Sequence, residues 1–539
     1  MNGILKQPCD ESVILTSPIA AAPCLQSAKP WILTATILAS SMAFIDGTVV
    51  NVALSALQRE FDATIVGAQW VVEAYGLFLA SLALVGGVMG DLYGRRRIFT
   101  LGIAIFAVAS IGCGMSRDIY QLILARAAQG IGAAMLVPGS LAIISATFPQ
   151  NERGRAIGIW SGMSAITGAA GPVIGGWLIE HASWRWAFFI NLPLAVVTLA
   201  ITFWKAPESR GERPASRPDW QGALLVTAGL GLIIYSLIET PNQGWLKPRV
   251  IGTLAAGVTC VILFIFVESR SASPILPLDL FRSLNFSGAN ALTLLLYSAL
   301  GGSMFFLPLN LILVQGYSAT AAGAALLPFI LLFSFLSGWA GGLVNHWGPK
   351  KPLVIGPLIV GIAFVLLALP GQGGSYWTTF FPGISLLGLG MATSVAPLTT
   401  VVMTSLSSDR AGVASGVNNA VARVAAVLAV AVFGVVMLLS FNTALDRRLD
   451  NLGPPPDARR QLDSDRAKFA AMQPPATLEP ELAANIRRAI AESFIVGFRF
   501  ALSLAAALAV LGAVISWLII GNTAQNSRAR RSPQCAQDE

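Results

Sequence analysis

Three ionisable residues, Asp46, Glu73 and Arg126, lie inside long apolar segments of this 539-residue chain. A charge in an apolar core is costly to keep, so ionisable residues there are functional candidates by default. Carboxylates that face an arginine across a wet cavity can pair with it, and the groups then change one another's pKa. Such a carboxylate can bind a proton on one side of a barrier and release it on the other. The residue types therefore indicate reversible proton binding.

The positions of these residues within their segments place the three charges near one depth. At 1.5 Å per residue, Asp46 lies about 22 Å into its segment, whereas Glu73 and Arg126 lie about 8 and about 10 Å into segments of opposite direction. An apolar layer about 30 Å thick then holds all three charges about 8 to 10 Å from one face. We interpret Arg126 as a fixed cation that tunes both carboxylates. Gln129 and Asn51 are weaker polar candidates for contacts with a substrate or another helix.

Structural roles are the alternatives for both carboxylates. Asp46 can simply be the partner of Arg126 or Thr48, and Glu73 is near enough to the surface for its carboxylate to reach water. The sequence alone leaves these interpretations open.

The composition shows what kind of element holds these charges. Hydrophobic residues make up 55% of the chain, charged residues make up 12%, and the mean hydropathy is +0.69. A soluble protein carries about 25% charged residues, so this chain cannot cover a water-facing surface of its size. The sequence therefore predicts an all-α polytopic membrane protein.

Composition and motifs also exclude several functions. The net charge of +8 comes from basic residues scattered among short loops, which is not the pattern of a nucleic-acid surface. The five cysteines show no paired spacing and the two histidines are isolated, so we predict neither a disulfide framework nor a metal site. The sequence contains no nucleophile–base pair, phosphate loop or zinc-protease motif. We therefore predict no enzyme and no cofactor.

Fourteen apolar segments are long enough to cross a bilayer, which takes about 20 residues each. Nineteen of the 35 Lys and Arg residues fall on the side of the N-terminus, and five fall in the short connections on the other side. Because basic residues concentrate in cytoplasmic loops, both ends of the chain are predicted to be cytoplasmic. The predicted spans are 31–53, 68–90, 98–116, 119–147, 156–180, 184–204, 220–239, 250–268, 286–314, 319–344, 352–370, 376–405, 411–440 and 493–521.

Two similar loops indicate an internal repeat. The loops "GVMGDLYGRRR" (87–97) and "GGLVNHWGPKK" (341–351) share glycines and a basic pair at an offset of 254 residues. That offset is too long for six helices, and a charged linker with two further spans accounts for the excess. The predicted organisation is a cytoplasmic tail (1–30), a six-helix half (31–204), a linker with two inserted helices (205–285), a second six-helix half (286–521) and a cytoplasmic tail (522–539).

The second half contains a long connection, 441–492, on the predicted outer side. We interpret it as a solvated loop, although its segment "LEPELAANIRRAIAES" could instead form an amphipathic helix on the surface. Neither interpretation assigns it a function.

Several motifs follow one another in a fixed order along the chain. They are "FIDGTVVNVAL" (44–54), "GVMGDLYGRRR" (87–97), "LILARAAQGIGAA" (122–134), "GAAGPVIGG" (168–176) and "WRWAFFINLPLA" (184–195). In this order they resemble the major facilitator superfamily, specifically its fourteen-helix drug:H+ antiporter branch (EmrB/QacA type), over nearly the whole chain. Two positions depart from that branch: Ser55 replaces its usual proline, and Glu73 stands where it often has a small polar residue.

The resemblance implies an inner (plasma) membrane exporter that exchanges protons for amphiphilic or cationic small molecules by alternating access between two halves. A transporter of a specific metabolite, siderophore or lipid-like compound is the alternative, and a membrane enzyme or sensor ranks below both. The expected partners are the small-molecule substrate, protons and the lipid bilayer, with no nucleic acid. A periplasmic adaptor is left open. Arg423 resembles a family arginine of the thirteenth span, and the pattern names no partner for it.

The fifth span carries a run of small residues. Small faces let membrane helices approach closely, and a proline bends the helix that contains it. The resembling family places this segment where its halves meet and associates it with antiport. We interpret it as a hinge that makes no chemical contact with the substrate, formed by Gly168, Gly171, Pro172, Gly175 and Gly176.

The loop at 87–97 is interpreted as part of a cytoplasmic gate. Its arginines hold the loop inside, its glycines allow a tight turn, and Asp91 can meet positive side chains or a helix N-terminus. Asn345 replaces this aspartate in the second copy, so a charged latch is expected in one half only. The predicted gate residues are Gly87, Asp91, Gly94, Arg95, Arg96 and Arg97.

Overall fold

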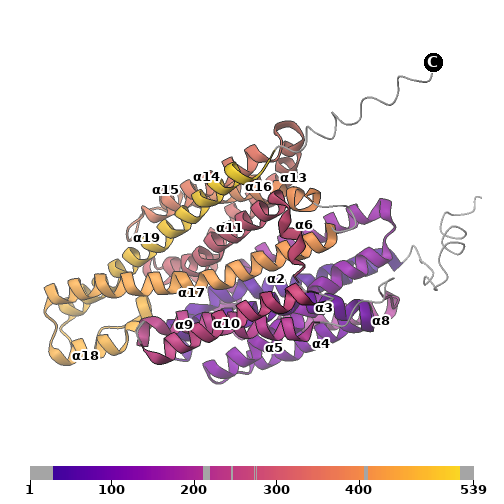
Figure 1. The fold of residues 1–539 in the computed structure, drawn as a ribbon. Coiled ribbons are helices and arrows are strands. Elements are labelled where there is room, and N and C mark those ends of the chain that lie inside the picture. The colour runs from indigo at the N-terminus through magenta and orange to yellow at the C-terminus, as the bar shows by residue number, and fades with distance from the viewer. Residues whose placement is uncertain are drawn as a thin grey trace, which may run out of the picture.

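The computed structural model describes residues 28–210, 219–243, 247–271, 274, 276–405 and 411–521. Within these ranges every regular element is helical, and most helices run side by side along one axis (Figure 1). Thirteen of the helices are long and apolar enough to cross a membrane. Helices suit this environment because they satisfy their own backbone hydrogen bonds. The predicted tails 1–30 and 522–539 lie almost wholly outside the described residues.

The N-terminal half begins with a long helix and continues through short turns. Asp118 and Thr64 begin their helices with side chains that accept backbone N–H groups, of Gln121 at 2.9 Å and Gly67 at 3.3 Å. The helices are α2 (Lys29–Glu60), α3 (Ile65–Tyr93), α4 (Arg95–Gly114), α5 (Ile119–Thr147), α6 (Gln150–His181), α7 (Trp186–Phe189) and α8 (Asn191–Lys205).

Helix α6 covers the predicted span 156–180, but several of its side chains lie outside the described residues, so it is not counted among the thirteen apolar helices. The other thirteen predicted spans each correspond to one of those helices.

Two inserted helices, α9 (Trp220–Gln243) and α10 (Pro248–Arg270), pack against each other. Helix α9 also packs on both α3 and the C-terminal half, whereas α10 exposes large apolar side chains such as Ile262 and Phe266. We infer that α10 faces lipid.

The C-terminal half repeats the arrangement of the N-terminal half. Gly94 separates α3 from α4 with a φ of +113°, and Gly348 ends the corresponding helix of the second half with a φ of +72°. Both values favour glycine. The elements are η2 (Leu278–Arg282), α11 (Leu284–Leu309), η3 (Asn310–Val314), α12 (Ala319–Ala325), α13 (Leu327–Trp347), α14 (Lys350–Ala368), α15 (Tyr376–Thr379), α16 (Phe381–Thr404), α17 (Ala411–Leu452), α18 (Pro456–Ser464), η5 (Arg466–Ala471) and α19 (Pro480–Ile519).

The interpretation of 441–492 as a solvated loop is wrong. Helix α17 continues to Leu452, α19 already begins at Pro480, and α18 and η5 lie between them (Figure 1). The connection has its own core, because Phe469 of η5 is buried and its ring lies 5.1 Å from that of Phe441 and 6.1 Å from that of Phe494. The amphipathic helix proposed for "LEPELAANIRRAIAES" is present as the start of α19.

Segment η5 also connects the two halves at the predicted outer end. Lys468 forms an ion pair of 2.7 Å with Asp62, in the turn between α2 and α3. Hydrogen bonds to Asp62 and then Asp465 raise the pKa of the Lys468 ammonium above its usual value, so this contact stays charged well above neutral pH.

Other contacts between the halves lie toward the same end. Glu180 of α6 accepts hydrogen bonds from the backbone N–H and the hydroxyl of Thr320, each 2.7 Å long. Beside it, α6 and α12 touch through their backbones, because a Cβ on Gly323 would overlap the carbonyl of Pro172. The structure is therefore closed on its predicted outer side.

We predict that Gly323→Val opens this outer side. The added side chain would meet Pro172 of α6 and force α6 and α12 apart. Spin labels at the exposed outer positions Arg117 and Thr378, in a cysteine-free background, should then show a longer mean separation. Gly252→Val is the matched control, because a Cβ at Gly252 meets nothing within 4 Å. An unchanged distance in folded Gly323→Val would contradict the contact.

Candidate functional site

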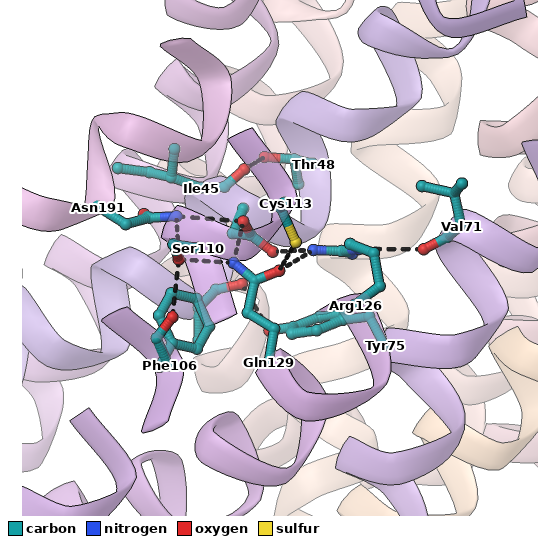
Figure 2. A network of polar contacts seen from close by, with 12 residues as sticks. Ile45, Thr48, Val71, Tyr75, Phe106, Ser110, Cys113, Arg126, Gln129 and Asn191 are labelled. Carbon is teal, nitrogen blue, oxygen red and sulfur yellow. Dashed lines mark hydrogen bonds and ion pairs between the residues drawn. The ribbon is translucent and has the colours of Figure 1, made fainter. Parts of the chain in front are cut away.

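Asp46 of α2 and Arg126 of α5 form a buried ion pair in the N-terminal half (Figure 2). The Arg126 guanidinium donates through Nη1 to Oδ2 of Asp46, and the side chains are 1% and 0% exposed, respectively. Two charges removed from water to this extent are stable only when each is neutralised and hydrogen-bonded. The structure thus pairs Asp46 with Arg126, which were predicted to lie at a similar depth in the apolar layer.

Two amides complete the coordination of the carboxylate. Oδ1 of Asp46 accepts from Nε2 of Gln129 at 2.7 Å and from Nδ2 of Asn191, the first residue of α8, at 3.1 Å. Gln129 is also bound to the arginine, because its Oε1 accepts from Nη1 of Arg126 at 2.7 Å. Gln129 therefore contacts both members of the ion pair.

Helix α3 holds the arginine from the other side. Nε of Arg126 donates to the carbonyl of Val71 at 3.0 Å, and its guanidinium lies 4.2 Å from the centre of the Tyr75 ring. The Tyr75 hydroxyl in turn donates to the carbonyl of Ala43 at 3.1 Å. A cation over an aromatic face is stabilised by the ring quadrupole, so Tyr75 helps to fix the guanidinium and links α3 to α2.

Helix α4 closes the network. Ser110 accepts from Nε2 of Gln129 at 2.9 Å, and the Cys113 thiol contacts Oε1 of Gln129 at 3.5 Å. These side chains meet because α4 and α5 approach closely, at a place where a Cβ on Gly132 would overlap the backbone of Phe106. The small residues of "LILARAAQGIGAA" (122–134) thus position the polar network.

Glu73 is not part of this network, contrary to the expectation that all three charges meet. Its side chain is 1% exposed, and neither carboxylate oxygen has a hydrogen-bond partner among the described residues. On the same face of α3, Gln69 donates to the carbonyl of Val430 at 3.1 Å, and a Cβ on Gly76 would meet Val427. Glu73 therefore lies on the face of α3 that packs on α17.

Asn51 also stays outside the network. It is half-buried, and the described part of the chain provides it with no hydrogen bond.

The loop predicted as a gate is organised by a residue that sequence reasoning missed. Asp91 accepts from Nε of Arg95 at 2.8 Å, one helical turn away. The N-terminus of α4 is instead occupied by Glu208, which follows α8, accepts from the backbone N–H of Arg96 at 3.0 Å and lies 3.7 Å from Arg97. Asp91 therefore meets a positive side chain within its own half.

The two glycines of the gate loop differ in how closely they pack. A Cβ on Gly94 would overlap the Glu208 carboxylate, and one on Gly87 would lie 3.8 Å from Pro138. The side chains of 341–346 in the second copy, which include Asn345, lie outside the described residues.

The small residues of α6 face two different helices. Cβ atoms built on Gly168, Gly171 and Gly175 would meet Phe44, Thr48 and Val49 of α2, respectively. Gly176 instead faces the backbone of Ala319, and the Pro172 carbonyl faces Gly323, both on α12. This run therefore packs between the two halves; its role as a hinge stays a prediction.

Some residues that form the ion-pair network and the gate loop could be found from the sequence, and others could not. Asn191 lies within the quoted motif "WRWAFFINLPLA", so an amide inside an apolar segment was a usable signal. Tyr75, Ser110 and Glu208 gave no such signal, because their types are common in membrane helices and loops.

The chain is similar to known transporters over most of its length. Residues 36–430 match the model of the Major Facilitator Superfamily. The multidrug resistance protein Stp of Mycobacterium tuberculosis is 34% identical, with 90% of this chain and 91% of that protein covered. The tetracenomycin C resistance and export protein of Streptomyces glaucescens is 32% identical, with the same coverage.

Solved structures show the same fold. A bacterial homologue of the lysosomal transporter Spinster has a TM-score of 0.61 at 17% identity, over 90% of this chain and 97% of that one. The xylose transporter of E. coli has a TM-score of 0.55 at 13% identity, over 92% and 97%.

We predict that Arg126→Met destabilises the protein by about 3 to 5 kcal/mol, because it leaves Asp46 buried without a cation. Asp46→Asn combined with Arg126→Met removes both charges and should recover much of that loss. Thermal unfolding of the detergent-purified protein measures both effects. Arg185→Met, which breaks a half-exposed pair with Glu60, should cost less than about 1 kcal/mol. A double variant as unstable as Arg126→Met would contradict the pairing.

Proposed function

Because the chain belongs to the major facilitator superfamily, whose members are membrane transporters, we propose that it exports small molecules in exchange for protons. The observation that carries the proposal is the buried, hydrogen-bonded Asp46–Arg126 pair, placed where α2, α3, α4, α5 and α8 meet. A static structural role requires no ionisable groups at this depth.

The similar proteins support the direction and the type of cargo. One is a multidrug resistance protein, and another is named for both resistance to and export of tetracenomycin C. A third, from Streptomyces alboniger, is a puromycin resistance protein that is 33% identical over 78% of this chain and 84% of its own length. We infer that the substrates are amphiphilic or cationic small molecules and that transport runs outward.

Proton exchange at Asp46 provides a physical switch. Protonation removes the negative charge that Arg126 faces and turns one carboxylate oxygen from an acceptor into a donor. The hydrogen bonds that Gln129 and Arg126 donate to Asp46 must then rearrange, and the contacts of Arg126 with Val71 and Tyr75 of α3 become a larger share of what holds the arginine. A proton bound at Asp46 therefore changes the force that α3 exerts on the other half.

The same scheme gives the gate residues a role. With the outer side closed, Asp91 pairs with Arg95 of its own half. We propose that this cluster meets the second half when the outer side opens, so that the inner side closes.

We predict that Asp46→Asn still folds and reaches the membrane, with a lower thermal stability because Arg126 loses its counterion, but loses gradient-driven export. Asparagine keeps the shape of aspartate, but it carries no charge and binds no proton. Accumulation of ethidium in cells and in proteoliposomes with an imposed pH gradient measures the loss. Glu60→Gln, at the partly exposed outer end of α2, is the control and should export normally. Wild-type export that survives collapse of the proton gradient would overturn antiport altogether.

We predict a different defect for Glu73→Gln. Burial without a hydrogen-bond donor favours an uncharged side chain, so glutamine should preserve the outer-closed packing against α17 and the thermal stability. We propose that Glu73 is a second proton site, ionised only when the halves separate, and that its loss flattens the dependence of export on external pH. Proteoliposome export at several external pH values measures this. A pH profile identical to that of the wild type would assign Glu73 a structural role.

A further inference from the structure

A second intramembrane arginine, Arg423 of α17, differs from Arg126 in having no counterion among the described residues. The Arg423 side chain is half-buried, and it makes no hydrogen bond or ion pair with any described residue. Nδ2 of Asn418, five residues before Arg423, donates to Asn290 at 3.2 Å and to Thr293 at 2.6 Å, both on α11. Among the residues that the structure describes, no carboxylate therefore neutralises the charge of Arg423.

The packing of α17 shows where this charge points. Arg423, Val427, Val430 and Gly434 follow one another at helical spacing along one face. Val427 meets Gly76 of α3, and both Val430 and Gly434 meet Gln69. The face that bears Arg423 is thus turned toward α3, and Arg423 lies one turn further inward than the contact between Val427 and Gly76.

Two tyrosines lie near the level of Arg423 on neighbouring helices. Tyr75 of α3 precedes Gly76, whose Cβ would meet Val427, and Tyr297 of α11 precedes Ser298, which donates to the carbonyl of Ala425 at 3.2 Å. Tyr75 also covers Arg126, whose guanidinium lies 4.2 Å from the centre of the Tyr75 ring (Figure 2). Tyr297 is half-buried, as Arg423 is. Both C-terminal side chains are thus partly exposed, whereas Arg126 is buried.

An unpaired guanidinium in this position favours an anion. Its planar donors match the two oxygens of a carboxylate, and a tyrosine hydroxyl beside it can donate a further hydrogen bond. Building on the proposed export function, we propose that Arg423 and Tyr297 form a subsite for the carboxylate of an amphiphilic substrate. The exported molecules then include organic acids with an apolar body.

Three fluorescent probes with one apolar body test the subsite. They are 1-pyrenebutyric acid, its methyl amide and 1-pyrenebutylamine, which are negative, neutral and positive at neutral pH. Their affinities for the purified full-length protein in nanodiscs are measured by energy transfer from its tryptophans. Wild-type protein should bind the acid about tenfold tighter than the amide, as a hydrogen bond to a charged group implies.

Arg423→Gln should abolish the preference for the acid while leaving the affinity for the amide unchanged, and Arg423→Lys should keep part of it. Tyr297→Phe should weaken binding of the acid only. Arg499→Gln is the matched control, because Arg499 of α19 donates to backbone carbonyls at Ala368 and Leu369; it should bind all three probes as the wild type does.

Two results would overturn the subsite. One is a wild-type protein that binds the amide or the amine as tightly as the acid. The other is an Arg423→Gln variant that weakens all three probes equally and is restored by Glu73→Gln, because Arg423 would then be a partner of Glu73 in another conformation. Binding needs no gradient, so a normal preference for the acid without proton-driven export would instead contradict the proposed antiport.

Discussion

The cost of keeping Asp46 and Arg126 away from water is the constraint on which the rest of the N-terminal half depends. An ion pair at this depth is tolerated only when the remaining donors and acceptors also find partners. Gln129 of α5, Asn191 of α8 and the Val71 carbonyl of α3 supply them. Each partner comes from a helix that must approach closely, and small residues such as Gly132 make that approach sterically possible. The motifs of this half therefore supply the polar side chains and the small residues that one polar network needs.

Helix α3 connects this network to the opposite half. One face presents Val71 and Tyr75 to Arg126, and the other presents Gln69, Glu73 and Gly76 to α17. A change in how tightly Arg126 is held therefore acts on an element that already forms the interface. The glycine contacts between α6 and α12 make that interface a close backbone fit, in which small shifts cannot be absorbed by side chains. We therefore expect the interface between the halves to switch between two discrete arrangements and not to deform continuously.

Much of this architecture could be predicted from the sequence, because hydropathy and charge determine which segments span a membrane and in which direction. Depth along a helix follows from the rise per residue, so Asp46 and Arg126 could be matched. Rotation about the helix axis does not follow from hydropathy when every face is apolar. Glu73 therefore had the right depth but the wrong face. The extension of α17 and the helix α18 were missed for a different reason: they leave the apolar layer, so their polar residues resemble those of a loop.

The contrast between the two arginines bears on which cargo the electrical gradient favours. Arg126 is neutralised by its own carboxylate, whereas Arg423 brings a net positive charge into the space near the opposite half. Moving one elementary charge across a membrane potential is worth about 2.3 kcal/mol per 100 mV. With the cell interior negative, a monovalent anion that leaves gains this energy, and a proton that enters gains it again. An exporter that neutralises an anionic cargo at Arg423 and a proton at Asp46 would therefore use both components of the gradient, whereas a cationic cargo would oppose one of them.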